Sequence, residues 1–144
     1  MITRRLSDPS ATRALGAELA GLARGGDALL LEGPLGAGKT TLARGFLVAA
    51  SGEEGLVVPS PSYTLVQTYE TRLGPVHHFD LWRLDGPTAL GELGWDEALA
   101  DIVLVEWPDR LGAQRPAWGL TVLLTISGEE SREARLDGWA ERLG

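Results

Sequence analysis

Residues 28–40 read Ala-Leu-Leu-Leu-Glu-Gly-Pro-Leu-Gly-Ala-Gly-Lys-Thr, and they contain the most informative local pattern of the chain. Its first four residues are all apolar, which is typical of a short strand that is buried on both faces of a sheet. Residues 33–40 then show the spacing G-x-x-x-x-G-K-T, and a helical pattern from Lys39 to about Ala50 follows. A strand, a glycine-rich loop and a helix in this order predict a phosphate-binding loop.

Each part of this loop has a physical role in holding phosphates. Its backbone N–H groups curl around a phosphate, its glycines permit close approach, and the helix N-terminus favours negative charge. We expect Lys39 to contact the β- and γ-phosphates of ATP and the Thr40 hydroxyl to bind Mg²⁺. The predicted nucleotide-binding residues here are Gly33, Pro34, Leu35, Gly36, Ala37, Gly38, Lys39, Thr40 and Thr41.

Composition narrows the class of protein. The chain has 144 residues, a net charge of -7 and no cysteine, and its single lysine is Lys39. The size predicts one domain over residues 1–144, and the absence of cysteine excludes disulfides and thiolate metal sites. The acidic charge disfavours direct binding of DNA or tRNA. No apolar run approaches the roughly 20 residues of a membrane span and no secretion signal is recognisable, so a cytoplasmic location is expected.

The remaining sequence predicts an α/β fold of the P-loop NTPase type. We expect three layers, with a central mixed sheet, an antiparallel hairpin insertion and helices on both faces. Apart from the buried strand and the loop, the predicted elements are a short edge strand at 2–6, a helix over about 10–24, hairpin strands at 63–70 and 76–81, one or two short helices within 86–100, a buried strand at 102–105 and paired strands at 120–126 and 134–136.

The second hairpin strand has a two-residue period. It places Val76, His78 and Asp80 on one face and His77, Phe79 and Leu81 on the other. Only the second face is expected to belong to the core. Because adjacent strand residues point in opposite directions, His77 and His78 cannot ligate one ion, and we expect no zinc site. His78 is expected to form a hydrogen bond near the nucleotide.

Two carboxylates are candidates for the magnesium and water chemistry of the site. Glu106 follows the buried strand at 102–105, where such NTPases place an acid that binds the metal or orients the attacking water. Asp80, on the polar face of the second hairpin strand, is the other candidate. The predicted catalytic residues are Lys39, Asp80 and Glu106, and the predicted metal ligands are Thr40, Asp80 and Glu106.

The sequence says less about which residues contact the base of the nucleotide than about those that contact its phosphates. Guanine-specific GTPases read their base with an Asn-Lys-x-Asp segment, and this chain contains no asparagine and no second lysine. Adenine packs well against aromatic or guanidinium planes, so Trp107, Arg132 and Arg135 are the candidates for contacting it.

Beyond the loop, several segments together resemble one family. They are GPLGAGKTTLARGF at 33–46, SPSYTLV at 60–66, HFDLWRL at 78–84, ELGWDE at 92–97 and VEWP at 105–108, with a weaker feature, SREAR, at 131–135. In order and spacing they resemble the TsaE (YjeE) family of small bacterial ATPases, which are required for threonylcarbamoyladenosine formation at position 37 of certain tRNAs. Ser62 and Trp82 depart from this family's usual threonine and tyrosine.

The resemblance implies an ATPase that docks on paired TsaB and TsaD proteins and meets tRNA only through that complex. It also implies that Asp80 and Glu106 are nucleotide-site acids, that Trp107 lies near the nucleotide and that residues 60–64 form a mobile, switch-like loop. Hydrolysis by the chain alone is expected to be slow, since no arginine finger is assignable. Two other hypotheses remain open: a small-molecule kinase, and a nucleotide-sensing adaptor that does not need hydrolysis.

Overall fold

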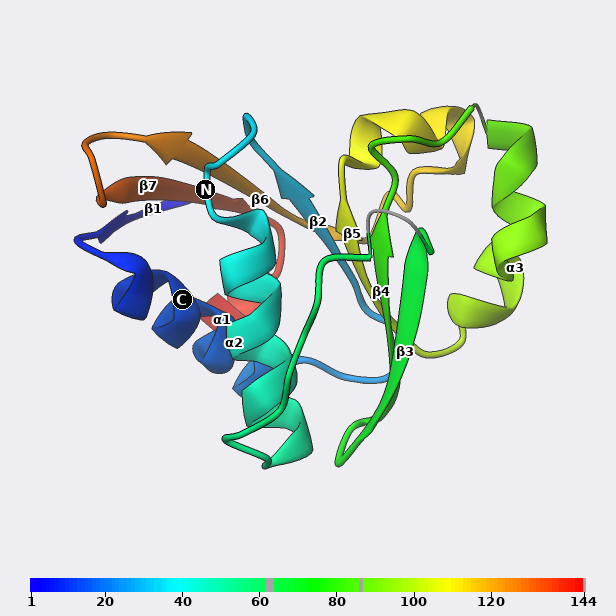
Figure 1. The fold of residues 1–144 in the computed structure, drawn as a ribbon, viewed down its shortest axis with the longest axis horizontal. Coiled ribbons are helices and arrows are strands. Elements are labelled where there is room, and N and C mark those ends of the chain that lie inside the picture. The colour runs from blue at the N-terminus through cyan, green and yellow to red at the C-terminus, as the bar shows by residue number, and fades with distance from the viewer. Residues whose placement is uncertain (62–63, 86, 144) are drawn as a thin grey trace.

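The computed structural model describes residues 1–61, 64–85 and 87–143. This part of the chain forms one seven-stranded mixed sheet with the strand order β1-β7-β6-β2-β5-β4-β3, shown in Figure 1. The strands are β1 (Ile2–Leu6), β2 (Ala28–Glu32), β3 (Val66–Thr71), β4 (Gly74–Asp80), β5 (Ile102–Glu106), β6 (Leu120–Ile126) and β7 (Arg132–Asp137).

Parallel strands occupy the middle of the sheet and antiparallel strands its two edges. β2 is parallel to β5 and β6, and β4 is parallel to β5. The hairpin strand β3 closes one edge, whereas β7 and β1 close the other by antiparallel pairing. The predicted mixed sheet with a hairpin is therefore confirmed. β7 is longer than expected, since it pairs with β6 over its whole length and with β1 on its other side.

Helices cover both faces of the sheet (Figure 1). α1 (Pro9–Leu22) and α2 (Lys39–Ser51) pack on one face, over a core that includes Leu29 and Leu104. A second core on the other face includes Leu30 and Val105 and is covered by short elements. These are η1 (Pro87–Leu93), α3 (Trp95–Ala98) and η2 (Pro108–Gln114), whereas α4 (Ala140–Leu143) ends the described chain. None of the helices in these described ranges has the length and hydropathy of a membrane span.

One expectation about the hairpin was wrong. Val76, His78 and Asp80 were expected to lie outside the core, but all three are buried, as are Phe79 and Leu81 on the opposite face. The reason is that β4 lies between two packed layers, with the core under α1 and α2 on one face and the core under η1, α3 and η2 on the other. The two-residue period itself is confirmed, because Val76 joins one core and Phe79 the other. The expected start of the first hairpin strand, Tyr63, lies outside the described residues.

α1 and α2 are in close contact through two glycines. A Cβ atom on Gly16 would lie 2.2 Å from the Leu42 carbonyl oxygen, and one on Gly45 would lie 2.1 Å from the Arg13 carbonyl oxygen. No real Cβ tolerates such distances to backbone atoms. The glycines therefore set the separation of the two helices, and with it the position of the glycine loop at the start of α2.

Gly45→Ala is expected to lower the free energy of unfolding by roughly 1–3 kcal/mol, because the added methyl group forces α1 and α2 apart. Gly21→Ala, also in α1, is the matched control. Nothing lies within 4 Å of a Cβ at Gly21, so its better helix propensity should raise stability by up to about 1 kcal/mol. Urea unfolding measures both effects, and equal stability of the two variants would contradict the packing argument.

Candidate functional site

The glycine loop lies between the end of β2 and the start of α2. Gly33 has φ 144°, and a Cβ there would lie 2.4 Å from the Leu124 carbonyl oxygen of the neighbouring strand, so no side chain fits. Gly38 precedes α2 with φ 103° and supplies no side-chain cap. The first N–H groups of α2 consequently have no side-chain cap, which is the arrangement that favours an anion at a helix N-terminus.

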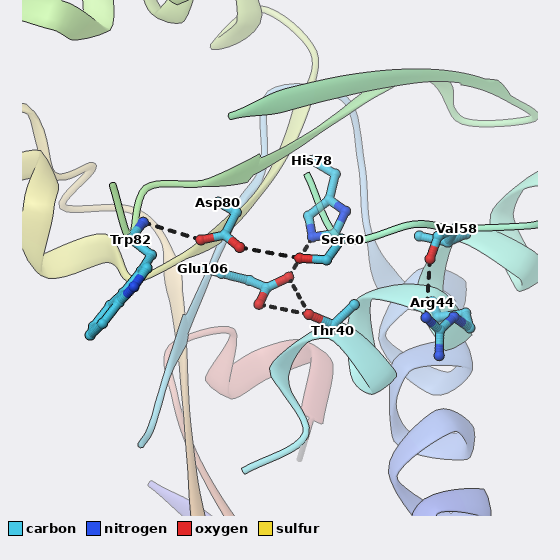
Figure 2. A network of polar contacts seen from close by, with 8 residues as sticks. All are labelled: Thr40, Arg44, Val58, Ser60, His78, Asp80, Trp82 and Glu106. Carbon is cyan, nitrogen blue, oxygen red and sulfur yellow. Dashed lines mark hydrogen bonds and ion pairs between the residues drawn. The ribbon is translucent and has the colours of Figure 1, made fainter. Parts of the chain in front are cut away.

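Two carboxylates reach the same edge of the sheet from neighbouring strands. Asp80 ends β4 and Glu106 ends β5, and the two residues are direct partners in the parallel register. Glu106 is also the register partner of Leu31 in β2, just before the loop. The relative exposures of Asp80 and Glu106 are only 4% and 3%. The sheet therefore brings both predicted acids to the start of α2, as Figure 2 shows for Glu106 and Thr40.

Glu106 is the centre of a buried hydrogen-bond network (Figure 2). The Thr40 hydroxyl lies 2.9 Å from each of its carboxylate oxygens. The His78 imidazole Nε2 lies 2.7 Å from Oε2. This bears out the expectation of a His78 hydrogen bond close to the site. Glu106 thus connects the first turn of α2 with the interior of β4.

Asp80 is held by a different set of groups. Its Oδ1 accepts a hydrogen bond from the Trp82 backbone N–H at 3.1 Å, and its Oδ2 accepts one from the Ser60 hydroxyl at 3.3 Å. Ser60 belongs to the segment that the resemblance describes as a switch-like loop, although positions 62 and 63 of it lie outside the described residues. Asp80 therefore joins the rigid sheet to this segment.

The Lys39 ammonium is enclosed within the loop. It donates to the carbonyl oxygens of Gly33 at 2.5 Å and Pro34 at 3.0 Å, and it lies 3.9 Å from the centroid of the Trp107 ring. Burial lowers the pKa of Lys39, and the negative charges of Glu106 and Asp80 oppose part of that shift. The ammonium is therefore incompletely compensated by its present surroundings, and a further anion would stabilise its charge.

These groups line a cavity of about 270 Å³. Its lining contains most of the predicted site residues, and it also contains Ser60 and Trp82, which the local sequence pattern did not single out. The lining residues are Leu35, Gly36, Gly38, Lys39, Thr40, Thr41, Ser60, Asp80, Trp82, Glu106 and Trp107. Gly33 and Pro34 face the site through their carbonyl oxygens, whereas Ala37 is fully buried.

The three predicted adenine contacts lie in different places. Trp107 lines the cavity, and its ring centroid is 4.4 Å from that of Trp82. Arg132 donates to the Gly36 carbonyl oxygen at 3.1 Å and so touches the loop from β7. Arg135 is exposed, contacts the Met1 sulfur at 3.4 Å and does not line the cavity. The structure therefore brings Trp107 and Arg132 to the loop and leaves Arg135 apart from it.

The oxygen donors at this site suit a hard cation that is bound by the protein and by phosphate oxygens together. One hydroxyl and two carboxylates converge here, and Mg²⁺ is commonly held by one or two carboxylates together with substrate phosphates and water. In the described ranges no three histidine, cysteine or acidic side chains form a metal-binding group. The residues present therefore fit a magnesium ion that arrives with phosphates rather than one held by protein ligands alone.

Comparison with known proteins gives a consistent result. The family model described as threonylcarbamoyl adenosine biosynthesis protein TsaE matches residues 6–135. The chain is similar to proteins named tRNA threonylcarbamoyladenosine biosynthesis protein TsaE. That of Nostoc sp. is 38% identical over 91% of this chain and 82% of the relative, and that of Bacillus subtilis is 35% identical over 90% and 80%. The solved structure of Bacillus subtilis YdiB superposes with TM-score 0.77 at 30% identity, covering 98% of this chain and 87% of that one.

Inorganic tripolyphosphate with Mg²⁺ is expected to raise the melting temperature of the protein, because it can replace the carbonyl partners of Lys39 and meet the uncapped start of α2. At about 100 times its Kd a ligand stabilises the folded state by roughly 2.7 kcal/mol. Lys39→Ala should lose most of this effect, whereas Arg24→Ala, at an exposed arginine outside the cavity, should keep it. Equal stabilisation of Lys39→Ala and wild type would contradict the assignment of the loop.

Proposed function

The chain belongs to the TsaE family of threonylcarbamoyl adenosine biosynthesis proteins, and from this premise we infer that it is a P-loop ATPase that uses Mg²⁺-ATP. Its role is in the formation of threonylcarbamoyladenosine on tRNA, for which we assign position 37 as the modified site. The observation that carries the proposal is the convergence of Lys39, Thr40, Asp80 and Glu106 on one small cavity beside the start of α2.

The cavity itself argues for phosphate recognition. At about 270 Å³ it is smaller than most sites that enclose a whole drug-sized ligand, so it suits the phosphates while the base and sugar lie outside. Trp107 and Trp82 line it, and Arg132 contacts the loop at Gly36. ATP is favoured over GTP, because an aromatic or guanidinium plane accepts adenine and the chain has no guanine-reading segment.

The roles of the site residues follow from their present contacts. Lys39 would exchange its carbonyl partners for β- and γ-phosphate oxygens. The Thr40 hydroxyl now donates a hydrogen bond to Glu106. In the complex it would bind the metal together with Asp80 or Glu106. Mg²⁺ would supply charge neutralisation on the phosphates. Once Thr40 is engaged elsewhere, a Glu106 carboxylate oxygen becomes available to orient the attacking water.

Hydrolysis by the chain alone should be slow. The described residues that line the cavity include no arginine, and missing transition-state charge stabilisation of this kind costs about 10³–10⁵ in rate. We therefore infer that TsaB- and TsaD-type proteins dock on the chain and complete the site or its arrangement. In this scheme they hold the tRNA, in agreement with the net charge of -7 on this chain.

The test is an ATPase assay with and without purified TsaB- and TsaD-type proteins, with tRNA as a further variable. Phosphate release that rises when the partners are added supports the proposal. Labelled phosphate on a metabolite would instead identify a kinase. Partner binding that depends on ATP but survives loss of hydrolysis, with tRNA modification intact, would identify a nucleotide-sensing adaptor.

Glu106→Ala is expected to lower ATP turnover in the assembled system by about 10²–10⁴, the usual contribution of a positioned acid or base. Binding of ATP should persist, because Lys39 and the loop are unchanged. Glu18→Ala is the control, since Glu18 pairs only with Arg4 at the surface in the described part of the chain. A Glu106→Ala protein that turns over ATP at the wild-type rate with its partners would defeat the assignment of this carboxylate.

A further inference from the structure

His78 is a fully buried histidine behind the cavity. Its relative exposure is 0%, and it does not line the cavity, yet its Nε2 lies 2.7 Å from Glu106 Oε2. A carboxylate is a hydrogen-bond acceptor only, so the imidazole N–H donates. Figure 2 shows the imidazole directed at this carboxylate from β4. Among the described residues, Glu106 is the one to which His78 is hydrogen-bonded.

Packing alone does not explain a histidine at this position, because burying a polar imidazole is unfavourable. A buried imidazole loses its hydration, and its other nitrogen, Nδ1, has no hydrogen-bond partner among the described residues. Val76, two residues earlier on the same face of β4, is a fully buried aliphatic residue, so an apolar side chain suits this layer of the sheet. Within the described part of the chain, the hydrogen bond to Glu106 is the polar contact that offsets the burial of His78.

The Glu106 carboxylate has few other hydrogen-bond partners in the described part of the chain. Thr40 is its other hydrogen-bond partner in the described structure, and in the proposed function the Thr40 hydroxyl would hold the metal instead. The Glu106 carboxylate would then depend on His78 for its orientation. Such a partner behind a reacting carboxylate matters because an error of about 1 Å in the position of a catalytic group can cost on the order of 10²-fold in rate.

We propose that His78 is a positioning residue for Glu106, which holds the carboxylate aimed at the attacking water while Thr40 is engaged with the metal. This inference rests on the proposed ATPase function and deepens it. It assigns to His78 no contact with ATP and no proton transfer. The expected signature is a loss of turnover without a loss of nucleotide binding.

Two substitutions separate the hydrogen bond from the packing. His78→Leu keeps an apolar side chain of similar size but removes the donor, whereas His78→Gln keeps an N–H donor. His77→Leu is the matched control, because the neighbouring His77 lies on the other face of β4 and contacts Thr68 and Asp101 instead. ATP turnover with the TsaB- and TsaD-type partners, ATP affinity and melting temperature are measured for all three.

We expect His78→Leu to lower kcat by about 10- to 100-fold, the usual cost of losing a partner behind a site ligand, with ATP affinity unchanged. His78→Gln should recover most of the turnover, and His77→Leu should keep it. Wild-type turnover in His78→Leu would overturn the proposal. A parallel fall of kcat, affinity and melting temperature in both His78 variants would also overturn it, because that pattern marks a purely structural residue.

A second measurement is independent of activity. The chain has only two histidines, so nitrogen-edited NMR resolves both rings, and His77→Leu assigns them. We expect a slowly exchanging Nε2–H on His78 that is lost in Glu106→Ala. A rapidly exchanging His78 ring that is indifferent to Glu106→Ala would overturn the inference. If the wild-type protein neither binds nor hydrolyses ATP while this ring signal is present, the proposed function fails and the His78–Glu106 contact stands.

Discussion

The parallel pairing of β5 with both β2 and β4 is the constraint on which the whole site depends. In this register Glu106 stands beside Leu31 on one side and Asp80 on the other. Parallel strands end at a common edge of the sheet. Two acids and a glycine loop that are far apart in the chain therefore meet there, and no long loop is needed to position them. The close contact of α1 and α2 at Gly16 and Gly45 then sets α2, and with it Lys39 and Thr40, against that edge.

Electrostatics explains why this edge favours a ligand. Lys39, Asp80 and Glu106 are all buried, and one ammonium with two carboxylates leaves an excess of negative charge. Phosphates alone would add to that excess, whereas phosphates that carry a divalent cation would offset it. The lowered pKa of Lys39 adds the complementary need for an anion, because burial outweighs the attraction of the two acids. This charge balance supports the proposal that the ligand is Mg²⁺-ATP rather than a phosphate compound without metal.

The sequence predicted what local patterns encode. The loop, the apolar strands at 28–31 and 102–105 and the helix from Lys39 follow from spacing and periodicity, and all are present. The burial of both faces of β4 did not follow, because it depends on which distant elements pack over each face of the sheet. The different surroundings of Arg132 and Arg135 could have been foreseen, since residues three apart in a strand point to opposite faces. Contacts such as that between His78 and Glu106 could not be predicted, because they depend on the register between strands that are distant in sequence.

The two carboxylates differ in how they are held, and this difference bears on mechanism. Glu106 is fixed by His78 from within the sheet, whereas Asp80 accepts a hydrogen bond from Ser60, in the segment that follows Val58. Arg44 of α2 donates to the Val58 carbonyl oxygen at 3.1 Å, which ties the start of this segment to the helix that begins at the loop (Figure 2). A change in the position of residues 58–61 would therefore affect Asp80 through Ser60. The hydrogen bond between His78 and Glu106 would stay in place. A docking partner that moves this segment would shift Asp80 while Glu106 keeps its position. Such a shift is a simple physical way to make hydrolysis depend on the partner.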